Sequence, residues 1–272
     1  VSTSTSTSSA VLVFLAPIDF CTVLVHLCQE HGVIGVRFDA RGGGKSGGRP
    51  GHVGERHLLY QDVGRMIRQA RLSFPGRPVF LGGVVGGASM AINYVNSDLA
   101  SKQPGSLPAG LFLINPLLEP KGTYGTAQSR DMFKKEPLSL FKRLLNRKSK
   151  IALNPQVSAV LQTGLYNAEY FDAHLLAGDA VREANKAMSL VPGYLLLSKD
   201  FMLADNAAFH AALDPKPHHL LTQLQLTTGD LVQILQQAVN YGGPWMSRLA
   251  ASMSPSPLHT LVLIPTYLNP YH

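Results

Sequence analysis

The chain has 272 residues, of which 45% are hydrophobic and only 15% are charged. This composition is typical of a packed globular domain and argues against a disordered chain. Lys and Arg number 24 against 17 Asp and Glu, so the net charge is +7. This excess favours an anionic neighbour, such as nucleic acid, an anionic membrane surface or an acidic protein. The strongly apolar runs are about seven residues long, too short to span a bilayer.

The N-terminal tract, residues 1–10, is rich in Ser and Thr. Its composition fits the end of a processed presequence, a disordered linker or the edge of a fragment. Cys21 and Cys28, the only two cysteines, fall on one expected helix and form no disulfide framework. This usage indicates a reducing, intracellular compartment. A mitochondrial location is a further hypothesis, drawn from the positive charge and the presequence-like composition.

Strand-like and helix-like patterns alternate from Val11 onward. Short apolar runs predict strands, apolar residues at helical spacing predict helices, and Gly and Pro clusters separate them. We expect strands at 11–15, 33–39, 79–83 and 110–115, with helices at 20–30, at 57–73 and from near Val84 or Val85. This order predicts an α/β fold with a mostly parallel sheet wound by helices.

The alternation stops after Pro120, and the core is therefore assigned to residues 11–120. Residues 121–254 are mostly helical in pattern, apart from a possible strand near 194–198, and form an expected insertion. Residues 255–272 contain a strand-like run at 259–264, which we expect to be a C-terminal core strand.

A glycine-rich turn follows the second expected strand. Its Gly44-Lys45-Ser46 sequence is similar to the end of a phosphate-binding P-loop, but the glycine required five residues before the Gly-Lys pair is Asp39. Two glycines and a proline at 47–50 also disfavour a helix start there. We therefore expect no nucleotide site at this turn, and no cofactor.

The same turn resembles that of the α/β-hydrolases. Residues 39–46 fit the pattern Asp-x-Arg-Gly-x-Gly-x-Ser. Residues 47–53 read Gly-Gly-Arg-Pro-Gly-His-Val and residues 75–81 read Pro-Gly-Arg-Pro-Val-Phe-Leu, both similar to the monoglyceride lipase and serine aminopeptidase branch. The resemblance covers residues 11–118. It implies an α/β-hydrolase fold with a helical lid in the insertion, and a Ser-Asp-His triad as its active site.

The resemblance also implies a nucleophile elbow, Gly-x-Ser-x-Gly, directly after the strand at 79–83. The sequence there is Gly82-Gly83-Val84-Val85-Gly86, so we place the serine position at Val84, beside Val85. Valine has no nucleophilic atom. Ser89 is the nearest alternative, but an elbow there would put four glycines in the strand, so we expect Ser89 about one turn into the helix.

Other parts of the implied active site are also eroded. The loop that should supply an oxyanion-hole amide begins with Ala16, and the Pro17 that follows has no amide hydrogen. An active chain would have to use Ser89, Asp200 and His272 instead.

The acid position depends on which segment is the next core strand. If it is 194–198, Asp200 holds the acid position. If it is 259–264, the acid position falls near Asn269, and the chain ends before the strand that delivers the histidine. We favour the second alternative because 257–266 looks more like that strand.

Seven of the 24 basic residues lie within residues 134–150, where apolar residues recur at helical spacing. The stretch predicts either a solvated helix face or a contact with an anionic membrane, RNA or an acidic partner. No aromatic residues alternate with the charges in a way that would read bases, so sequence-specific nucleic-acid recognition is not expected. The candidate partner-binding residues are Lys142, Arg143, Arg147 and Lys148.

These patterns predict a catalytically inactive α/β-hydrolase-like protein, acting as a structural or accessory subunit of a larger protein or ribonucleoprotein assembly. One alternative is an active serine hydrolase of esters or lipids with displaced catalytic residues. Another is a small-molecule binding protein that uses the old pocket. No His, Cys, Asp and Glu cluster has metal-ligand spacing, so no metal is expected.

Overall fold

The computed structural model describes residues 10–15, 32–43, 45–135, 150–153, 165–199, 201–214, 220–224 and 231–253. Some predictions fall outside these residues: residues 1–9, the helix at 20–30, Ala16, Asp200, His272, residues 255–272 and the basic candidates Lys142, Arg143, Arg147 and Lys148.

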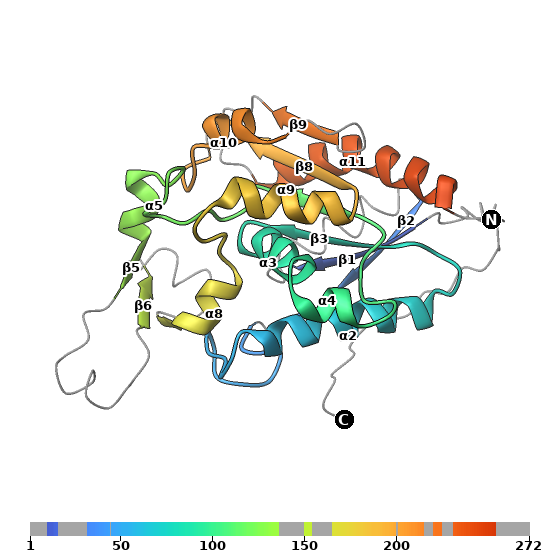
Figure 1. Ribbon diagram of the computed structural model, residues 1–272, viewed down its shortest axis with the longest axis horizontal. Coiled ribbons are helices and arrows are strands. Elements are labelled where there is room, and N and C mark those ends of the chain that lie inside the picture. Colours follow the sequence, from blue (N-terminus) through green and yellow to red (C-terminus); the bar gives the residue numbers. More distant parts are fainter. Residues whose placement is uncertain are drawn as a thin grey trace.

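A six-stranded sheet with the order β2-β1-β3-β4-β8-β9 forms the centre of the molecule (Figure 1). All five neighbouring pairs are parallel. In the register, Val13 lies opposite Val36 on one side and Leu81 on the other. The predicted parallel core is therefore confirmed. The strands are β1 (Ala10–Leu15), β2 (Val33–Arg37), β3 (Val79–Val84), β4 (Leu111–Ile114), β8 (Gly193–Ser198) and β9 (Leu220–Leu224).

Helices cover both faces of the sheet, because alternate strand residues point to opposite sides. Val11 and Val13 pack with one group of helices, whereas Ala10 and Leu12 pack with α11 on the other face. The predicted helix at 57–73 is confirmed. The first face is covered by α2 (His57–Ser73), α3 (Gly86–Val95), α4 (Asp98–Lys102), α9 (Ala180–Leu190) and α10 (Asn206–Ala212), and the second by α11 (Leu231–Met253). None of the described helices combines the length and the hydropathy of a transmembrane segment.

β8 decides between the two alternatives for the next core strand. It pairs directly with β4, with Leu113 opposite Leu195, and β9 pairs on its far side. The preferred placement of 259–264 beside the fourth strand is therefore wrong, and 194–198 is the next strand. The predicted insertion at 121–254 is also too long, because residues 193–198, 220–224 and 231–253 belong to the core.

A smaller unit interrupts the core between β4 and α9, at the left of Figure 1. We call it the insertion; it contains α5 (Ala127–Met132), β5 (Phe133–Lys135), β6 (Lys150–Leu153), β7 (Leu165–Asn167) and α8 (Ala168–Ala173). Its three strands are antiparallel. Both ends of the basic stretch 134–150 are thus strands, where a helix was expected. Pro137 disfavours helical backbone in the residue before it, so helical spacing cannot extend back to Lys134.

Candidate functional site

The turn between β3 and α3 consists of one residue, Val85. Its backbone dihedral angles are φ 51° and ψ −114°, a conformation that is a true outlier for a β-branched residue. The Val85 N–H donates to the Ile114 carbonyl at 2.9 Å, and its carbonyl accepts the N–H groups of Leu117 and Ser89, both at 3.2 Å. A strained strand-to-helix turn of the nucleophile-elbow type is therefore present.

Close packing of two glycines fixes the reading frame of this elbow. A Cβ atom on Gly83 would lie 2.2 Å from the carbonyl carbon of Gly87, so only glycine fits at position 83. The motif is therefore Gly83-Val84-Val85-Gly86-Gly87, and the serine position is Val85. The prediction that placed it at Val84 is one residue off, because glycines at 82, 83, 86 and 87 fit two frames. Val84 is 5% exposed and packs in the core on the α11 side.

Apolar side chains pack over the elbow. Val85 is partly buried and contacts a cluster that draws residues from the insertion and from the segments after β4 and β8. Within it, the rings of Phe133 and Phe171 have centroids 5.2 Å apart. The cluster consists of Leu117, Phe171, Leu175 and Leu203, with Val85, Met132, Phe133 and Phe201 packed against it. The side chain at the elbow thus packs against apolar side chains of the insertion and of the segments after β4 and β8.

Ser89 lies in the first turn of α3 and is fully buried. Its Oγ donates to the Leu117 carbonyl at 2.9 Å and lies 3.4 Å from the Val85 carbonyl. The expected position inside the helix is confirmed. A buried hydroxyl that donates to a backbone carbonyl satisfies that carbonyl and is not presented to a substrate.

The strand order shows where the remaining triad members would belong. Asp200 follows the end of β8 by two residues, as in the alternative that assigned it the acid position. The family's histidine follows the acid in the chain. The strand after β8 exists as β9, but residues 225–230, between β9 and α11, read Gln-Leu-Thr-Thr-Gly-Asp. The connection after β9 therefore contains no histidine. The favoured alternative of the sequence analysis was that the chain ends before this strand, but the strand is present.

The glycine-rich turn after β2 is tied to α2 by an ion pair. The guanidinium of Arg41 donates from Nε and Nη2 to the two carboxylate oxygens of Asp62, each at 2.7 Å. Asp39 accepts the Lys45 N–H at 3.0 Å, and the Ser46 hydroxyl donates to the Asp39 carbonyl. The Asp-x-Arg-Gly pattern therefore has a structural role here: its side chains stabilise the turn and attach it to α2.

Asn167 connects this turn to the insertion, and sequence reasoning missed it. Its Oδ1 accepts the N–H groups of Val53 at 3.2 Å and of Tyr170 at 3.1 Å, and its Nδ2 donates to the Val53 carbonyl. It is also the N-cap of α8. An Asn before a helical run is a recognisable cap signal, but its second role as a bridge is visible only in three dimensions.

Two aromatic side chains of α8 and its C-cap lie beside the elbow. Tyr170 stacks on His174 with ring centroids 4.6 Å apart, and a Cβ on Gly86 would lie 3.1 Å from the His174 Cβ. Burial, and then the Asp39 charge, raise the pKa of Tyr170 to about 12. Burial lowers the pKa of His174, against the opposing effect of its contact with the Tyr170 carbonyl. Both side chains are thus favoured in their neutral forms.

A buried amide network lies at the carboxyl ends of β4 and β8. Asn115 has a positive φ of 45°, and its Oδ1 accepts from the Ser198 N–H at 2.7 Å and the Asn206 Nδ2 at 3.0 Å. The Asn206 Nδ2 also donates to the Ser198 carbonyl at 2.8 Å. These bonds fix the strand ends next to Asp200 in the sequence. No cluster of His, Cys, Asp or Glu among the described residues could hold a metal ion.

Comparison with known proteins agrees with this geometry. Residues 19–191 match the family described as serine aminopeptidase, S33. No curated protein matches the chain significantly.

Several solved structures are similar in fold. A soluble variant of monoglyceride lipase from Saccharomyces cerevisiae, in complex with a substrate analogue, has a TM-score of 0.63 and 13% identity, over 92% of this chain and 89% of that one. Est1E from Butyrivibrio proteoclasticus, with ferulic acid bound, has a TM-score of 0.57 and 13% identity, over 89% and 90%. The pyrethroid hydrolase PytH has a TM-score of 0.57 and 12% identity, over 89% and 98%. At such identities these likenesses show the fold, which is the predicted one.

Proposed function

We propose that this chain, which belongs to the serine aminopeptidase (S33) family, is a non-catalytic α/β-hydrolase that acts as a structural or accessory subunit of a larger assembly. Val85 is the observation that carries the proposal. The backbone of the elbow is built, yet the side chain that it presents has no nucleophilic atom. That side chain packs among apolar groups, where an acyl-transfer site would need donors for a developing negative charge.

Two further features support the absence of serine-hydrolase chemistry. Residues 225–230 supply no histidine after β9, and Pro17 has no amide hydrogen to donate to an oxyanion. In a serine protease triad, loss of the serine or of the histidine alone lowers kcat about a million-fold. Restoring one group would therefore leave the other deficits in place.

Labelling with a fluorophosphonate probe tests this part of the proposal, because the probe needs an activated serine. We expect no labelling of the wild-type chain and none of Val85→Ser, with an active lipase of similar fold as the positive control. Ser89→Ala is the matched variant for the displaced-serine alternative. Labelling of the wild-type chain that Ser89→Ala abolishes would establish that alternative and end the proposal.

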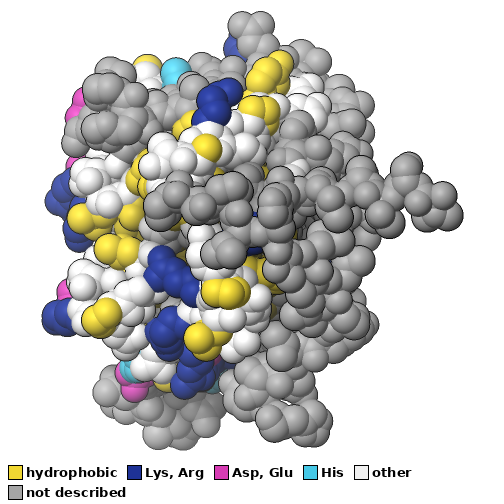
Figure 2. Space-filling view, turned by 90° about the vertical axis from the view of Figure 1, so that its right-hand side faces the viewer, with side chains coloured by type: hydrophobic (Ala, Val, Ile, Leu, Met, Phe, Trp, Pro, Cys, Tyr) yellow, Lys and Arg dark blue, Asp and Glu magenta, His cyan; other side chains and the backbone are white. Residues whose placement is uncertain are grey.

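The surface away from the elbow carries both apolar and basic side chains (Figure 2). On the side away from the elbow, hydrophobic side chains lie interspersed with Lys and Arg (Figure 2). The exposed apolar residues include Leu72 at 77%, Leu190 at 51% and Met253 at 46% exposure, near the C-terminal ends of α2, α9 and α11. Single exposed apolar side chains are normal on protein surfaces, so the proposed partner contact rests on the basic stretch described next.

For the principal partner contact we propose the basic stretch 134–150, which connects β5 to β6. Reversal of Lys142, Arg143, Arg147 and Lys148 to Glu should release the chain from its native assembly in a pull-down from lysate. Electrostatic attraction should also weaken with rising salt, since screening acts over about 8–10 Å. The control is an equal charge reversal at four exposed basic residues elsewhere, Lys102, Arg130, Arg182 and Lys186. If both variants co-purify at the wild-type level, the stretch is not the contact.

A further inference from the structure

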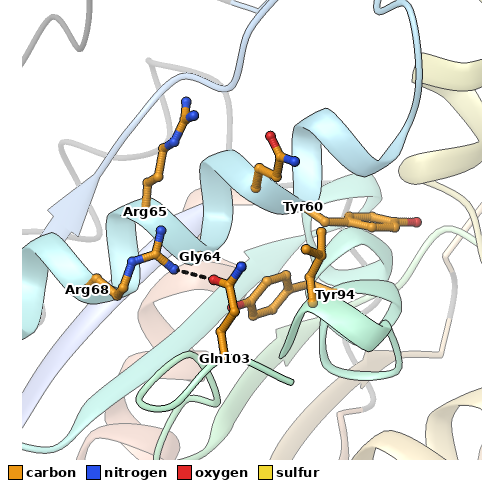
Figure 3. Close-up of a pocket in the computed structure, with 8 residues that line it drawn as sticks. Tyr60, Gly64, Arg65, Arg68, Tyr94 and Gln103 are labelled. Atoms are coloured by element: carbon orange, nitrogen blue, oxygen red, sulfur yellow. Dashed lines mark hydrogen bonds between the residues drawn. The ribbon is translucent and has the colours of Figure 1, made fainter. Parts of the chain in front are cut away.

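A small polar pocket lies between α2, α4 and the C-terminal end of α3 (Figure 3). Its volume is about 200 Å³. Tyr94 of its lining follows Val85 by nine positions on α3, about 13 Å at the rise of a helix, so the pocket is separate from the elbow. It is lined by Tyr60, Gln61, Gly64, Arg65, Arg68, Tyr94, Leu99 and Gln103, none of which is acidic.

Arg68 brings a half-buried positive charge to this pocket without a carboxylate partner among the described residues. Its Nη1 donates to the Gln103 Oε1 at 2.9 Å and lies 3.3 Å from the Ser106 Oγ. Both partners are neutral, and Figure 3 shows the Arg68 and Gln103 side chains meeting at the pocket. A partly desolvated cation whose partners carry no charge favours an anion nearby.

Arg65 adds a second guanidinium one helical turn earlier. Its Nη1 forms an ion pair with the Asp62 Oδ1 at 3.7 Å, and the Arg65 side chain is 58% exposed. The Asp62 carboxylate is already held by Arg41 through two 2.7 Å bonds, so its charge is shared. Gln103 uses its amide oxygen for Arg68, which leaves its NH₂ group able to donate. The pocket therefore has hydrogen-bond donors and the charge of Arg68 in its lining, whereas the Arg65 side chain extends away from Arg68 and Gln103 (Figure 3).

Gly64 makes room for this arrangement from the middle of α2. A Cβ atom there would lie 3.2 Å from the Tyr94 hydroxyl and 3.3 Å from the Arg68 Nη1. Glycine inside a helix costs about 1 kcal/mol relative to alanine. At this position the missing side chain leaves the space into which the guanidinium and the hydroxyl project.

We propose that this pocket binds a phosphate group, either free or as the monoester of a small molecule. The planar guanidinium fork matches phosphate oxygens in a bidentate geometry. The Arg68 guanidinium has only neutral partners among the described residues, so its charge is available to balance that of a phosphate. The volume is below the roughly 300–1,000 Å³ of pockets for larger organic ligands, which fits one phosphate with little else attached. The site is independent of the proposed loss of catalysis.

Isothermal titration at constant ionic strength tests the proposal, with inorganic phosphate, glycerol phosphate and sulfate as separate titrants. We expect saturable phosphate binding that Arg68→Gln weakens by about tenfold or more, as removal of a bidentate charge-assisted contact predicts. Arg182→Gln on α9 is the matched control, since it removes the same charge from a side chain that is 72% exposed. It should leave the dissociation constant unchanged within about twofold.

A second variant keeps the test valid if Arg68→Gln does not fold. Gly64→Ala retains every charge but narrows the pocket, and it should also weaken phosphate binding. Tighter binding of glycerol phosphate than of inorganic phosphate would identify a monoester as the ligand, whereas equal binding would identify phosphate alone. No saturation with either phosphate titrant, or an equal loss in Arg68→Gln and Arg182→Gln, would overturn the proposal.

Discussion

Val85 keeps a strained backbone although its side chain can do no chemistry. Residues in such conformations cost about 1–3 kcal/mol and persist where the surroundings over-determine them. Here the surroundings are visible: three backbone hydrogen bonds hold the residue, and Gly83 lets α3 approach β3. The elbow is thus maintained by the packing of a strand against a helix, and it survives without a nucleophile.

Gly83→Ala tests this account of the elbow. Its Cβ would lie 2.2 Å from backbone, so we expect a loss of about 3 kcal/mol or more in the free energy of unfolding. In Gly86→Ala, the matched variant, the nearest atom is the His174 Cβ at 3.1 Å, and the loss should be about 1 kcal/mol or less. Chemical denaturation measures both. Equal, small losses would show that the glycine contact does not hold the elbow.

His174 should make stability depend on pH. Its folded-state pKa lies below the ordinary value of 6.5, so the unfolded chain binds more protons in the window below that value. The free energy of unfolding should therefore fall as the pH drops from about 7 towards 5, by at most about 1.4 kcal/mol per pH unit for this one group. His174→Phe keeps a ring on Tyr170 and should have a shallower slope in denaturation at several pH values. An unchanged slope would contradict the prediction.

At the scale of elements, the insertion is attached to the core through polar contacts of α8 with the glycine-rich turn. Asn167→Ala removes the cap of α8 and both bonds to Val53. We expect a loss of about 2–3 kcal/mol, felt first within the insertion. Hydrogen exchange at the Tyr170 amide should speed up markedly, while amides of β3 keep their protection.

The control for Asn167→Ala is Asp205→Ala. Asp205 caps α10 through a single bond to the Ala208 N–H at 3.0 Å, so this change should cost only about 1 kcal/mol. If the two variants lose the same stability, the bridge from Asn167 to Val53 contributes nothing beyond capping.

The elements differed in how far the sequence could predict them. β1 and α2 were placed to within a residue, because apolar periodicity and Gly or Pro breaks mark them clearly. The serine position was misplaced, because glycines at 82, 83, 86 and 87 allow two frames, which are separated only by the contact of Gly83 with Gly87 and by the positive φ of Val85. The segment of β8 was the less favoured of two alternatives for the next core strand. Its partner β4 is distant in the sequence, and the pairing of distant strands leaves no local signal.

The pocket beside α2 was not predicted at all. Arg65 and Arg68 look like ordinary exposed helix residues in the sequence, and the partner Gln103 lies on the segment after α4. Only the packing of α2 against α4 brings them together. Sites built from several helices in this way lack a motif, in contrast to the elbow, whose pattern lies in five consecutive residues.

At the scale of the whole molecule, Trp245 is the single tryptophan and reports on the core. It is 9% exposed and packs against Phe80 and Tyr194, with ring centroids 5.7 Å and 6.0 Å away. If the core unfolds as one cooperative unit, tryptophan fluorescence and far-ultraviolet circular dichroism should give coincident denaturation curves. A circular dichroism transition that begins at lower denaturant than the fluorescence transition would show that part of the chain unfolds on its own.

The pairing of β4 with β8, which are far apart in the sequence, also affects how the chain folds during its synthesis. β2, β1, β3 and β4 all lie within the first 114 residues and can pair while the rest is still being translated. Until β8 emerges nearly 80 residues later, β4 is a fully apolar edge strand whose outer edge has no partner. Such edges invite pairing with other chains, and domains emerge from the ribosome at about 5–20 residues per second. The nascent chain therefore passes several seconds in a state that a chaperone would need to shield.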